Sequence, residues 1–304
     1  MDPKRHSVTA LAASLFRAVH ARVDEPKLVD EPYADRFVRE SERDFILERL
    51  LLMLDPERRD AIRALRDPAR AFETAVKANP AYGTIVVRTR YAEERLAEDL
   101  ARGVRQYVLV GAGMDTFAFR CPDLADRLEI FELDHPATQA MKRERLALAG
   151  LVPPANLHFV AVDLEEESIG AALTRTPYRA DVPAFFTCLG VLPYLTSETT
   201  RRMLAAIGAS ASAGSELVFD YLEVAALTPG RASAEATRVA AERAESAEPW
   251  VSGFDPDRVP ADLAAAGLAL VEDLDGAAVA RRYGAALRMV SHGHLARARV
   301  QGSV

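Results

Sequence analysis

The chain has 304 residues, of which 49% are hydrophobic, and is long enough to build one large core. Its formal net charge of −7 argues against an electrostatic nucleic-acid binder, which needs a concentrated basic surface. No apolar run approaches the roughly 18 residues of a membrane span, and the first residues form no apolar signal core. Two cysteines, Cys121 and Cys188, are too few for a disulfide framework or a structural zinc site. We therefore expect a globular cytoplasmic protein with reduced thiols that binds neither nucleic acid nor a membrane.

The first part of the chain is predicted to be mostly helical and to form an N-terminal helical cap over residues 1–103. Helices are predicted over residues 7–23, 32–39, 41–64 and 82–102. From residue 104 the pattern changes to apolar strands that alternate with helices, which is typical of a parallel sheet. Within the predicted core, residues 104–222, we expect a helix over 196–210 and strands over 107–110, 128–134, 157–162, 182–187 and 215–220.

The last part of the chain is predicted to complete this sheet. Residues 223–255 are rich in Ala, Glu and Arg and are predicted to form a helical lid insertion. Residues 256–304 supply a helix over 256–266, a sixth strand over 268–272 and a seventh, antiparallel strand within 288–300. The sequence therefore predicts one α/β domain over 1–304, with a doubly wound, Rossmann-like sheet of seven strands. It carries no signal for an oligomeric state.

The most informative segment is Gly111-Ala-Gly113, which directly follows the first predicted strand. Glycines at this point let the backbone approach a ligand that a side chain would exclude. The second strand ends on Asp134, which can accept hydrogen bonds from both hydroxyls of a ribose, and the third ends at Asp163. Two acids at the same edge of a parallel sheet predict a site for an adenosine-bearing cofactor.

The residues after the glycine turn indicate which cofactor this is. A dinucleotide fingerprint needs a third glycine where the chain has Thr116, and the preceding Asp115 would repel a pyrophosphate. An acid there suits the cationic groups of S-adenosylmethionine (SAM). Asp163 suits the exocyclic amine of adenine, and the N–H of Leu164 can donate to a ring nitrogen. SAM is therefore favoured over a nicotinamide dinucleotide, and an NAD(P)-dependent Rossmann oxidoreductase is kept as an alternative.

Over nearly its whole length the chain resembles the leucine carboxyl methyltransferase family, including bacterial SAM-dependent methyltransferases and polyketide O-methyltransferases. The resemblance rests on Ser7-Val-Thr-Ala10, Asp30-Glu-Pro-Tyr-Ala34, Val87-Arg-Thr-Arg-Tyr91, Gly111-Ala-Gly-Met-Asp-Thr116, Phe131-Glu-Leu-Asp-His-Pro136, Leu189-Gly-Val-Leu-Pro-Tyr-Leu195 and Arg281-Arg-Tyr283. It implies a class I methyltransferase sheet and methyl transfer to an oxygen, carboxylate or hydroxyl, of a small-molecule acceptor such as a secondary metabolite. Methylation of a protein's C-terminal carboxylate is the alternative within the family.

The resemblance also implies residue roles. Arg90 would hold the methionine carboxylate of SAM with its forked guanidinium. Leu189 stands where family members often carry Glu, so that contact must be met differently, and a binding protein without activity stays open as a further alternative. The residues expected to bind the cofactor are Arg90, Gly111, Ala112, Gly113, Asp134, Asp163, Leu164 and Leu189.

Catalysis by such a protein depends on positioning the acceptor and excluding water, because methyl transfer from SAM is a direct displacement. No metal is needed, and no cluster with metal-ligand spacing occurs in the sequence. A carboxylate acceptor needs no base, whereas a hydroxyl acceptor benefits from one. We assign no catalytic base, although His135, His292 and His294 are the nearby candidates. The residues predicted to line an acceptor pocket are Tyr194, Tyr221, Arg282 and Tyr283.

Overall fold

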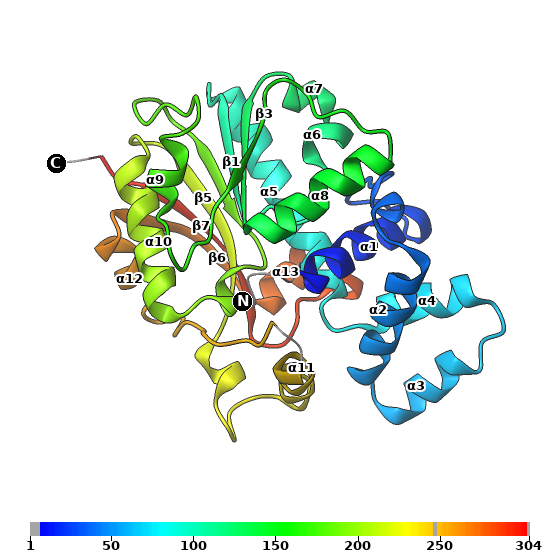
Figure 1. Cartoon of the computed structure of the whole chain (residues 1–304). Helices are drawn as coiled ribbons and strands as arrows, with labels where there is room; N and C mark the ends of the chain where they lie inside the picture. Colours follow the sequence, from blue (N-terminus) through cyan, green and yellow to red (C-terminus); the bar gives the residue numbers. More distant parts are fainter. Residues whose placement is uncertain (1–6, 246–247, 303–304) are drawn as a thin grey trace.

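A seven-stranded sheet forms the centre of the computed structural model, which describes residues 7–245 and 248–302 (Figure 1). The spatial order is β3-β2-β1-β4-β5-β7-β6, and β7 runs antiparallel to both of its neighbours. This confirms the predicted doubly wound sheet with an antiparallel last strand. The strands are β1 (Gln106–Val110), β2 (Glu129–Asp134), β3 (Leu157–Ala161), β4 (Phe185–Cys188), β5 (Glu216–Leu222), β6 (Leu268–Leu274) and β7 (Gly293–Val300).

Helices cover both faces of the sheet. All of β1 is buried, with Leu109 in one apolar core and Val108 in the other, as expected for a parallel strand covered on both sides. The first core packs against α5 and α8, and the second against α9, α10 and α12, which lie together on one side in Figure 1. These helices are α5 (Tyr82–Ala101), α8 (Pro136–Leu148), α9 (Ile169–Leu173), α10 (Ser197–Ser210) and α12 (Val259–Ala265).

The strand order reverses between β1 and β4, which creates the crevice where open α/β sheets bind ligands. In the register of the sheet, Val110 of β1 lies between Leu133 of β2 and Cys188 of β4. The residues that follow these positions therefore leave the sheet at the same edge. In this way the topology places the glycine turn, the acid at the end of β2 and the loop after β4 side by side.

The N-terminal region is helical, as predicted, but its helices differ from the prediction. The single helix predicted over 41–64 is two helices, α2 (Glu40–Leu52) and α3 (Pro56–Arg63). The side chain of Asp55 accepts a hydrogen bond from the N–H of Arg58 and Pro56 opens α3, so a new helix begins there. The same signal at Asp67 and Pro68 starts α4 (Pro68–Ala78), a helix that was not predicted.

Smaller elements complete the chain. Residues 32–39 contain only a 3-10 turn, η1 (Ala34–Phe37), and not the predicted helix. The other elements are α1 (Val8–Val23), α6 (Phe117–Arg120), α7 (Pro122–Ala125), η2 (Leu192–Tyr194), η3 (Val224–Leu227), α11 (Ala234–Glu245), α13 (Gly276–Tyr283) and η4 (Ala285–Leu287). Among the described residues, none of the helices combines the length and apolarity needed to cross a bilayer.

The predicted lid contains α11, which is joined to the N-terminal helices by charged contacts. Arg49 of α2 donates to Glu242 of α11 at 2.6 Å, and Arg243 donates to the hydroxyl of Thr9 in α1 at 2.8 Å. Figure 1 shows α11 below the edge of the sheet, apart from the helices that cover its two faces. The segment between β5 and α12 is therefore held by the cap as well as by the sheet.

Candidate functional site

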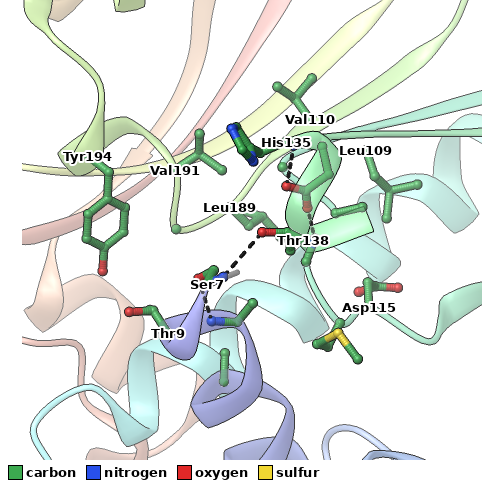
Figure 2. A pocket seen from close by; sticks show the side chains of 18 of the residues that line it. Ser7, Thr9, Leu109, Val110, Asp115, His135, Thr138, Leu189, Val191 and Tyr194 are labelled. Atoms are coloured by element: carbon green, nitrogen blue, oxygen red, sulfur yellow. Dashed lines mark hydrogen bonds between the residues drawn. The ribbon is translucent and has the colours of Figure 1, made fainter. Parts of the chain in front are cut away.

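A cavity of about 210 Å³ lies at the edge of the sheet where β1, β2, β3 and β4 end (Figure 2). Its walls come from the loops after these strands, and α1 and Glu248 close it from the other side. The structure brings most of the predicted cofactor residues to this cavity: Gly111, Ala112, Gly113, Asp134, Asp163, Leu164 and Leu189. Arg90 is not among the lining residues.

The glycine turn has a conformation that favours glycine. Gly111 and Gly113 adopt φ of 71° and 51°. A Cβ on Gly111 would lie 2.3 Å from Cγ2 of Val191, whose side chain also lines the cavity. The N–H groups of Gly111 and Ala112 both donate to the carbonyl of Leu133, at 2.8 and 3.1 Å, which holds the turn against β2. The turn therefore leaves space along the backbone that any side chain would fill.

Asp134 is held in place by backbone hydrogen bonds at the end of β2. One carboxylate oxygen accepts the N–H of His135 at 2.7 Å, and the other accepts the N–H of Gly113. Burial raises the pKa of Asp134, and the two backbone N–H groups offset part of this effect. A carboxylate has about four acceptor positions, so Asp134 keeps capacity for the two hydroxyls of a ribose.

Asp163 and Leu164 occupy the next position along the edge, after β3. The Asp163 carboxylate is about one third exposed and lies 3.7 Å from Nε2 of His135. The backbone N–H of Leu164 has no hydrogen-bond acceptor in the described part of the chain. An acceptor and a free donor on neighbouring residues match the amine and ring nitrogen at the edge of adenine.

Arg88, and not Arg90, is the arginine of the Val87-Arg-Thr-Arg-Tyr91 motif that lines the cavity. Arg88 donates to Asp220 at 3.0 Å, and Asp220 also accepts the N–H of Gly190. The side chain of Arg90 is 43% exposed and pairs with Glu94 at 2.8 Å, whereas that of Arg88 is 14% exposed. Residues two apart on α5 point about 200° apart, so only one of the two arginines can face the cavity.

Three of the four predicted acceptor residues also lie outside the cavity lining. Tyr283 donates to Glu94 at 2.8 Å and Arg282 lies 3.3 Å from the same carboxylate, next to Arg90. These contacts join α13 to α5 and are structural. Tyr221 is buried and donates to Asp273 at 2.6 Å. Only Tyr194 lines the cavity, and its hydroxyl has no hydrogen-bond partner among the described residues.

Asp115 and Thr116 are the two residues that distinguish this turn from a dinucleotide fingerprint. Asp115 is part of the cavity lining and Thr116 is not. Asp115 lines the cavity and accepts the N–H of Phe117 at 2.7 Å. Burial raises its pKa, but Arg120, Arg17 and Lys142 outweigh this effect, so the pKa is lowered and the carboxylate stays ionised. Thr116 is buried, is not among the residues that line the cavity, and donates through its hydroxyl to Glu31 in the N-terminal segment.

The side of the cavity formed by α1 and Glu248, called the roof below, contains residues that were not predicted from the sequence. The N–H and the hydroxyl of Thr9 donate to one carboxylate oxygen of Glu248, at 3.0 and 2.6 Å. The N–H of Ser7 donates to Thr138 of α8 at 3.3 Å, a contact that Figure 2 shows across the cavity. Ser7 and Thr9 belong to the Ser7-Val-Thr-Ala10 motif, which was a signal for them, but no motif marks Glu248.

Of the three histidines considered as bases, only His135 lines the cavity. His292 and His294 both lie against the carboxylate of Glu223, at 3.1 and 3.3 Å, outside the cavity lining. Both cysteines are free thiols within the described chain, as predicted, and burial raises the pKa of Cys121 to about 11. No group of side chains suited to a metal ion occurs among the residues that the structure describes.

An antiparallel β7 between β5 and β6, a glycine turn after β1 and acids after β2 and β3 define a class I SAM-dependent methyltransferase. The sequence profile of the leucine carboxyl methyltransferase family matches residues 10–208. The chain belongs to this family. Both the fold and the family therefore agree with the resemblance seen in the sequence.

Relatives with known names support the same class. The Bacillus subtilis protein named "Putative S-adenosyl-L-methionine-dependent methyltransferase YktD" is 31% identical over 277 residues, which cover 90% of each chain. A Mycolicibacterium gilvum protein with the same description is 30% identical over 250 residues, covering 82% of this chain and 76% of its own. The crystal structure of a protein from Thermobifida fusca titled "putative methyltransferase" is similar in fold, with a TM-score of 0.57 and 16% identity, and the match covers 99% of this chain and 97% of that one.

These findings identify SAM as the cofactor and methyl transfer as the activity. The alternative of a nicotinamide-dependent oxidoreductase is set aside, since the matching family and the named relatives are those of SAM-dependent methyltransferases. The cavity fits the group: the glycine turn leaves room along the backbone, Asp134 can bind the ribose, and Leu164 offers a donor to adenine.

Proposed function

We propose that the protein transfers the methyl group of SAM to an oxygen atom of a small-molecule acceptor. The observation that carries the proposal is the position of the cavity, which is closed by α1 and Glu248 above the predicted cofactor residues. Because α1 and Glu248 lie over the cofactor residues, they can keep water away from the reacting groups during transfer.

The polar lining near the roof supports an oxygen acceptor. Hydroxyl groups of Ser7, Thr9 and Tyr194 lie at this part of the cavity (Figure 2). They can donate to or accept from an oxygen and so fix its orientation toward the methyl group. SAM, when bound, supplies an electrophilic methyl carbon on a sulfonium, so the protein's own part in the reaction is to bind and orient both molecules.

We propose that Arg88 holds the carboxylate of the methionine portion, the role first predicted for Arg90. Arg88 lines the cavity beside Gly190. A Cβ added to Gly190 would lie 2.5 Å from the guanidinium of Arg88. The guanidinium of Arg88 also donates to Asp220 at 3.0 Å, which holds it in place. The guanidinium has five N–H donors, so it can pair with the carboxylate of SAM while it stays bonded to Asp220.

Methylation of a protein's C-terminal carboxylate is the alternative function within the family. Such an acceptor needs a channel wide enough for a polypeptide terminus, whereas α1 and the Glu248 segment meet over this cavity through Thr9. We therefore favour a metabolite-sized acceptor.

The test is transfer of radioactive methyl from SAM into a bacterial cell extract that has been separated by ultrafiltration. Label in the low-molecular-weight filtrate, and not in the protein fraction, is the expected result. The Asp134→Ala variant serves as the control that lacks the ribose contact. Label confined to the protein fraction would instead support the protein-directed alternative.

A further inference from the structure

Asp115 is an acid of the cavity lining whose carboxylate is only partly used by the protein itself. Its Oδ1 accepts the N–H of Phe117 at 2.7 Å. Its Oδ2 has no hydrogen bond and no ion pair among the residues that the structure describes, and the side chain lines the cavity. Figure 2 shows Asp115 on the opposite side of the view from Tyr194, which lies near the roof. The Oδ2 atom is therefore available to a bound molecule away from the acceptor end of the cavity.

The cations near Asp115 keep it ionised but bind other groups. Burial raises the pKa of Asp115, and the charges of Arg120, Arg17 and Lys142 outweigh this effect and lower it. Arg17 donates to a backbone carbonyl at 2.8 Å and Lys142 to a glutamate at 2.5 Å, and Arg120 also donates to a glutamate. None of the three forms a hydrogen bond or an ion pair with Asp115 in the described chain. The cavity thus contains a negative charge with an open acceptor position, which a cation with N–H groups can fill.

The other acids of the lining belong to different parts of the cavity. Asp134 follows β2 and can bind the ribose, and Asp163 follows β3 at the position suited to adenine. Glu165 accepts a hydroxyl group from α10, and Glu248 accepts from α1 at the roof. Asp115 instead belongs to the loop after β1, which contains the glycine turn.

Asp115 and Arg88 bring opposite charges to the same cavity from different elements. Asp115 lies in the loop after β1, and Arg88 of α5 lies beside Gly190 in the loop after β4. Leu189, in the same loop as Gly190, lines the cavity with an apolar side chain and offers no partner to a cation. The amino-acid portion of SAM has an ammonium group and a carboxylate on one carbon atom. This pair of charges matches Asp115 and Arg88.

We propose that Oδ2 of Asp115 accepts a hydrogen bond from the ammonium group of SAM while Arg88 holds the neighbouring carboxylate. The ammonium has three N–H donors, and a bond from it to a carboxylate is charge-assisted on both sides. This inference deepens the proposed function, because it rests on the SAM cavity and on the role proposed there for Arg88. It does not depend on which atom accepts the methyl group.

The chemistry of transfer favours the ammonium, and not the sulfonium, as the partner of Asp115. The sulfonium has no N–H or O–H donor, and its sulfur loses the positive charge as the methyl group leaves. A carboxylate placed against it would stabilise the bound cofactor more than the transition state and would slow the reaction. The ammonium keeps its charge and its donors throughout. Contacts from Asp115 and Arg88 to the same carbon atom fix the direction of the methionine chain and so help to position the methyl group.

The Asp115→Asn variant tests the contact, because it removes the charge and keeps an oxygen that can accept the N–H of Phe117. Calorimetric titration compares three ligands besides SAM. S-adenosylhomocysteine carries the ammonium without the sulfonium, and its deaminated analogue has hydrogen in place of the amino group. Methylthioadenosine lacks the ammonium and the carboxylate. Displacement of radioactive SAM measures any ligand that binds too weakly for direct titration.

We expect Asp115→Asn to weaken the binding of S-adenosylhomocysteine at least about tenfold. The affinities for the deaminated analogue and for methylthioadenosine should change less than about twofold, because neither ligand has the ammonium group. Loss of the amino group from the ligand should cost the unmodified protein about tenfold in affinity and cost the variant little.

Three results would overturn the inference. Equal losses for all ligands would mean that Asp115 only supports the glycine turn. A loss for SAM with none for S-adenosylhomocysteine would place the sulfonium at Asp115, and unchanged affinities would exclude any contact. Methyl transfer to nitrogen or carbon in the extract experiment would instead contradict the proposed oxygen acceptor and leave these affinities as expected.

Glu165→Gln is the matched control, since Glu165 is another acid of the lining but is bonded to α10. It should change the affinities for S-adenosylhomocysteine and for the deaminated analogue by the same factor, within about twofold. A discrimination as strong as that of Asp115→Asn would show that any loss of negative charge in the lining weakens ammonium binding, which would also overturn a specific role for Asp115.

Discussion

The hydroxyl of Thr116 donates a hydrogen bond to the carboxylate of Glu31, which joins the loop after β1 to the N-terminal cap. Both side chains are buried, and the guanidinium groups of Arg17 and Arg120 lie 3.4 and 3.7 Å from the same carboxylate. The position that a dinucleotide site fills with glycine is thus used here to attach the helices that close the cavity. This relationship also links two of the motifs by which the family was recognised.

Replacing Thr116 by valine should therefore destabilise the protein. The variant keeps the shape of the side chain but removes the donor to a buried carboxylate, which costs about 1–3 kcal/mol. The free energy of unfolding in urea measures the effect. Thr174→Val is the control, because Thr174 is exposed and bonds only to a nearby backbone carbonyl, and equal losses in the two variants would refute the role assigned to Thr116.

Substitution of Gly111 by alanine should weaken SAM binding at least about tenfold. Alanine is disfavoured at the positive φ of this position. Its Cβ would also clash with Val191 in the cavity wall. Gly214→Ala shares the positive φ but has open space around it, so it should lose stability and keep the cavity. Calorimetric titration with SAM distinguishes the two, and Val191→Ala in the Gly111→Ala background should restore part of the affinity. Similar affinities in both glycine variants would show that the turn does not bound the cofactor site.

Arg88→Met should lower the affinity for SAM about tenfold or more, since a charge-assisted pair with the methionine carboxylate is lost. Arg90→Met should change it less than about twofold, because Arg90 is paired with Glu94 outside the cavity. Parallel titrations with SAM and S-adenosylhomocysteine measure both. The reverse order of effects would restore the role first predicted for Arg90.

The stability of the protein should depend on pH through Asp99 of α5. Burial, followed by the nearby carboxylate of Glu216, raises the pKa of Asp99 to about 7. Between about pH 4 and pH 7 the native state therefore holds a proton that the unfolded state has released, so this group's contribution to stability falls as the pH rises through that window. Asp99→Asn removes this dependence.

Unfolding in urea at about pH 5 and pH 7.5 checks the sign of the effect. The free energy of unfolding of the variant minus that of the unmodified protein should become more positive as the pH rises. The increase is at most about 1.4 kcal/mol per pH unit. Asp181→Asn, on an exposed carboxylate paired with Arg179, should show no such change over this range. A constant difference for Asp99→Asn would mean that Asp99 is ionised throughout.

Part of the fold and of the site could be predicted from short segments of the sequence. The strand before Gly111 is buried throughout, and the strand that ends on Asp134 is mostly buried. Parallel strands end at a common edge, so the order of the strands along the chain was enough to predict a shared cofactor site. The antiparallel last strand was predicted within 288–300 and forms β7. The break between α2 and α3 had a local signal, the Asp55-Pro56 cap, that the helical periodicity concealed.

The sheet, the glycine turn and the acids at the strand ends could thus be predicted, because they depend on local patterns and on the common edge of parallel strands. Which arginine faces the cavity and which residues close it depend instead on how the helices pack in the folded chain. The rotation of α5 separates Arg88 from Arg90, and the packing of helices distant in sequence brings Thr9 and Glu248 together. Neither the orientation of a helix nor a contact between distant segments is encoded in a local pattern of residues.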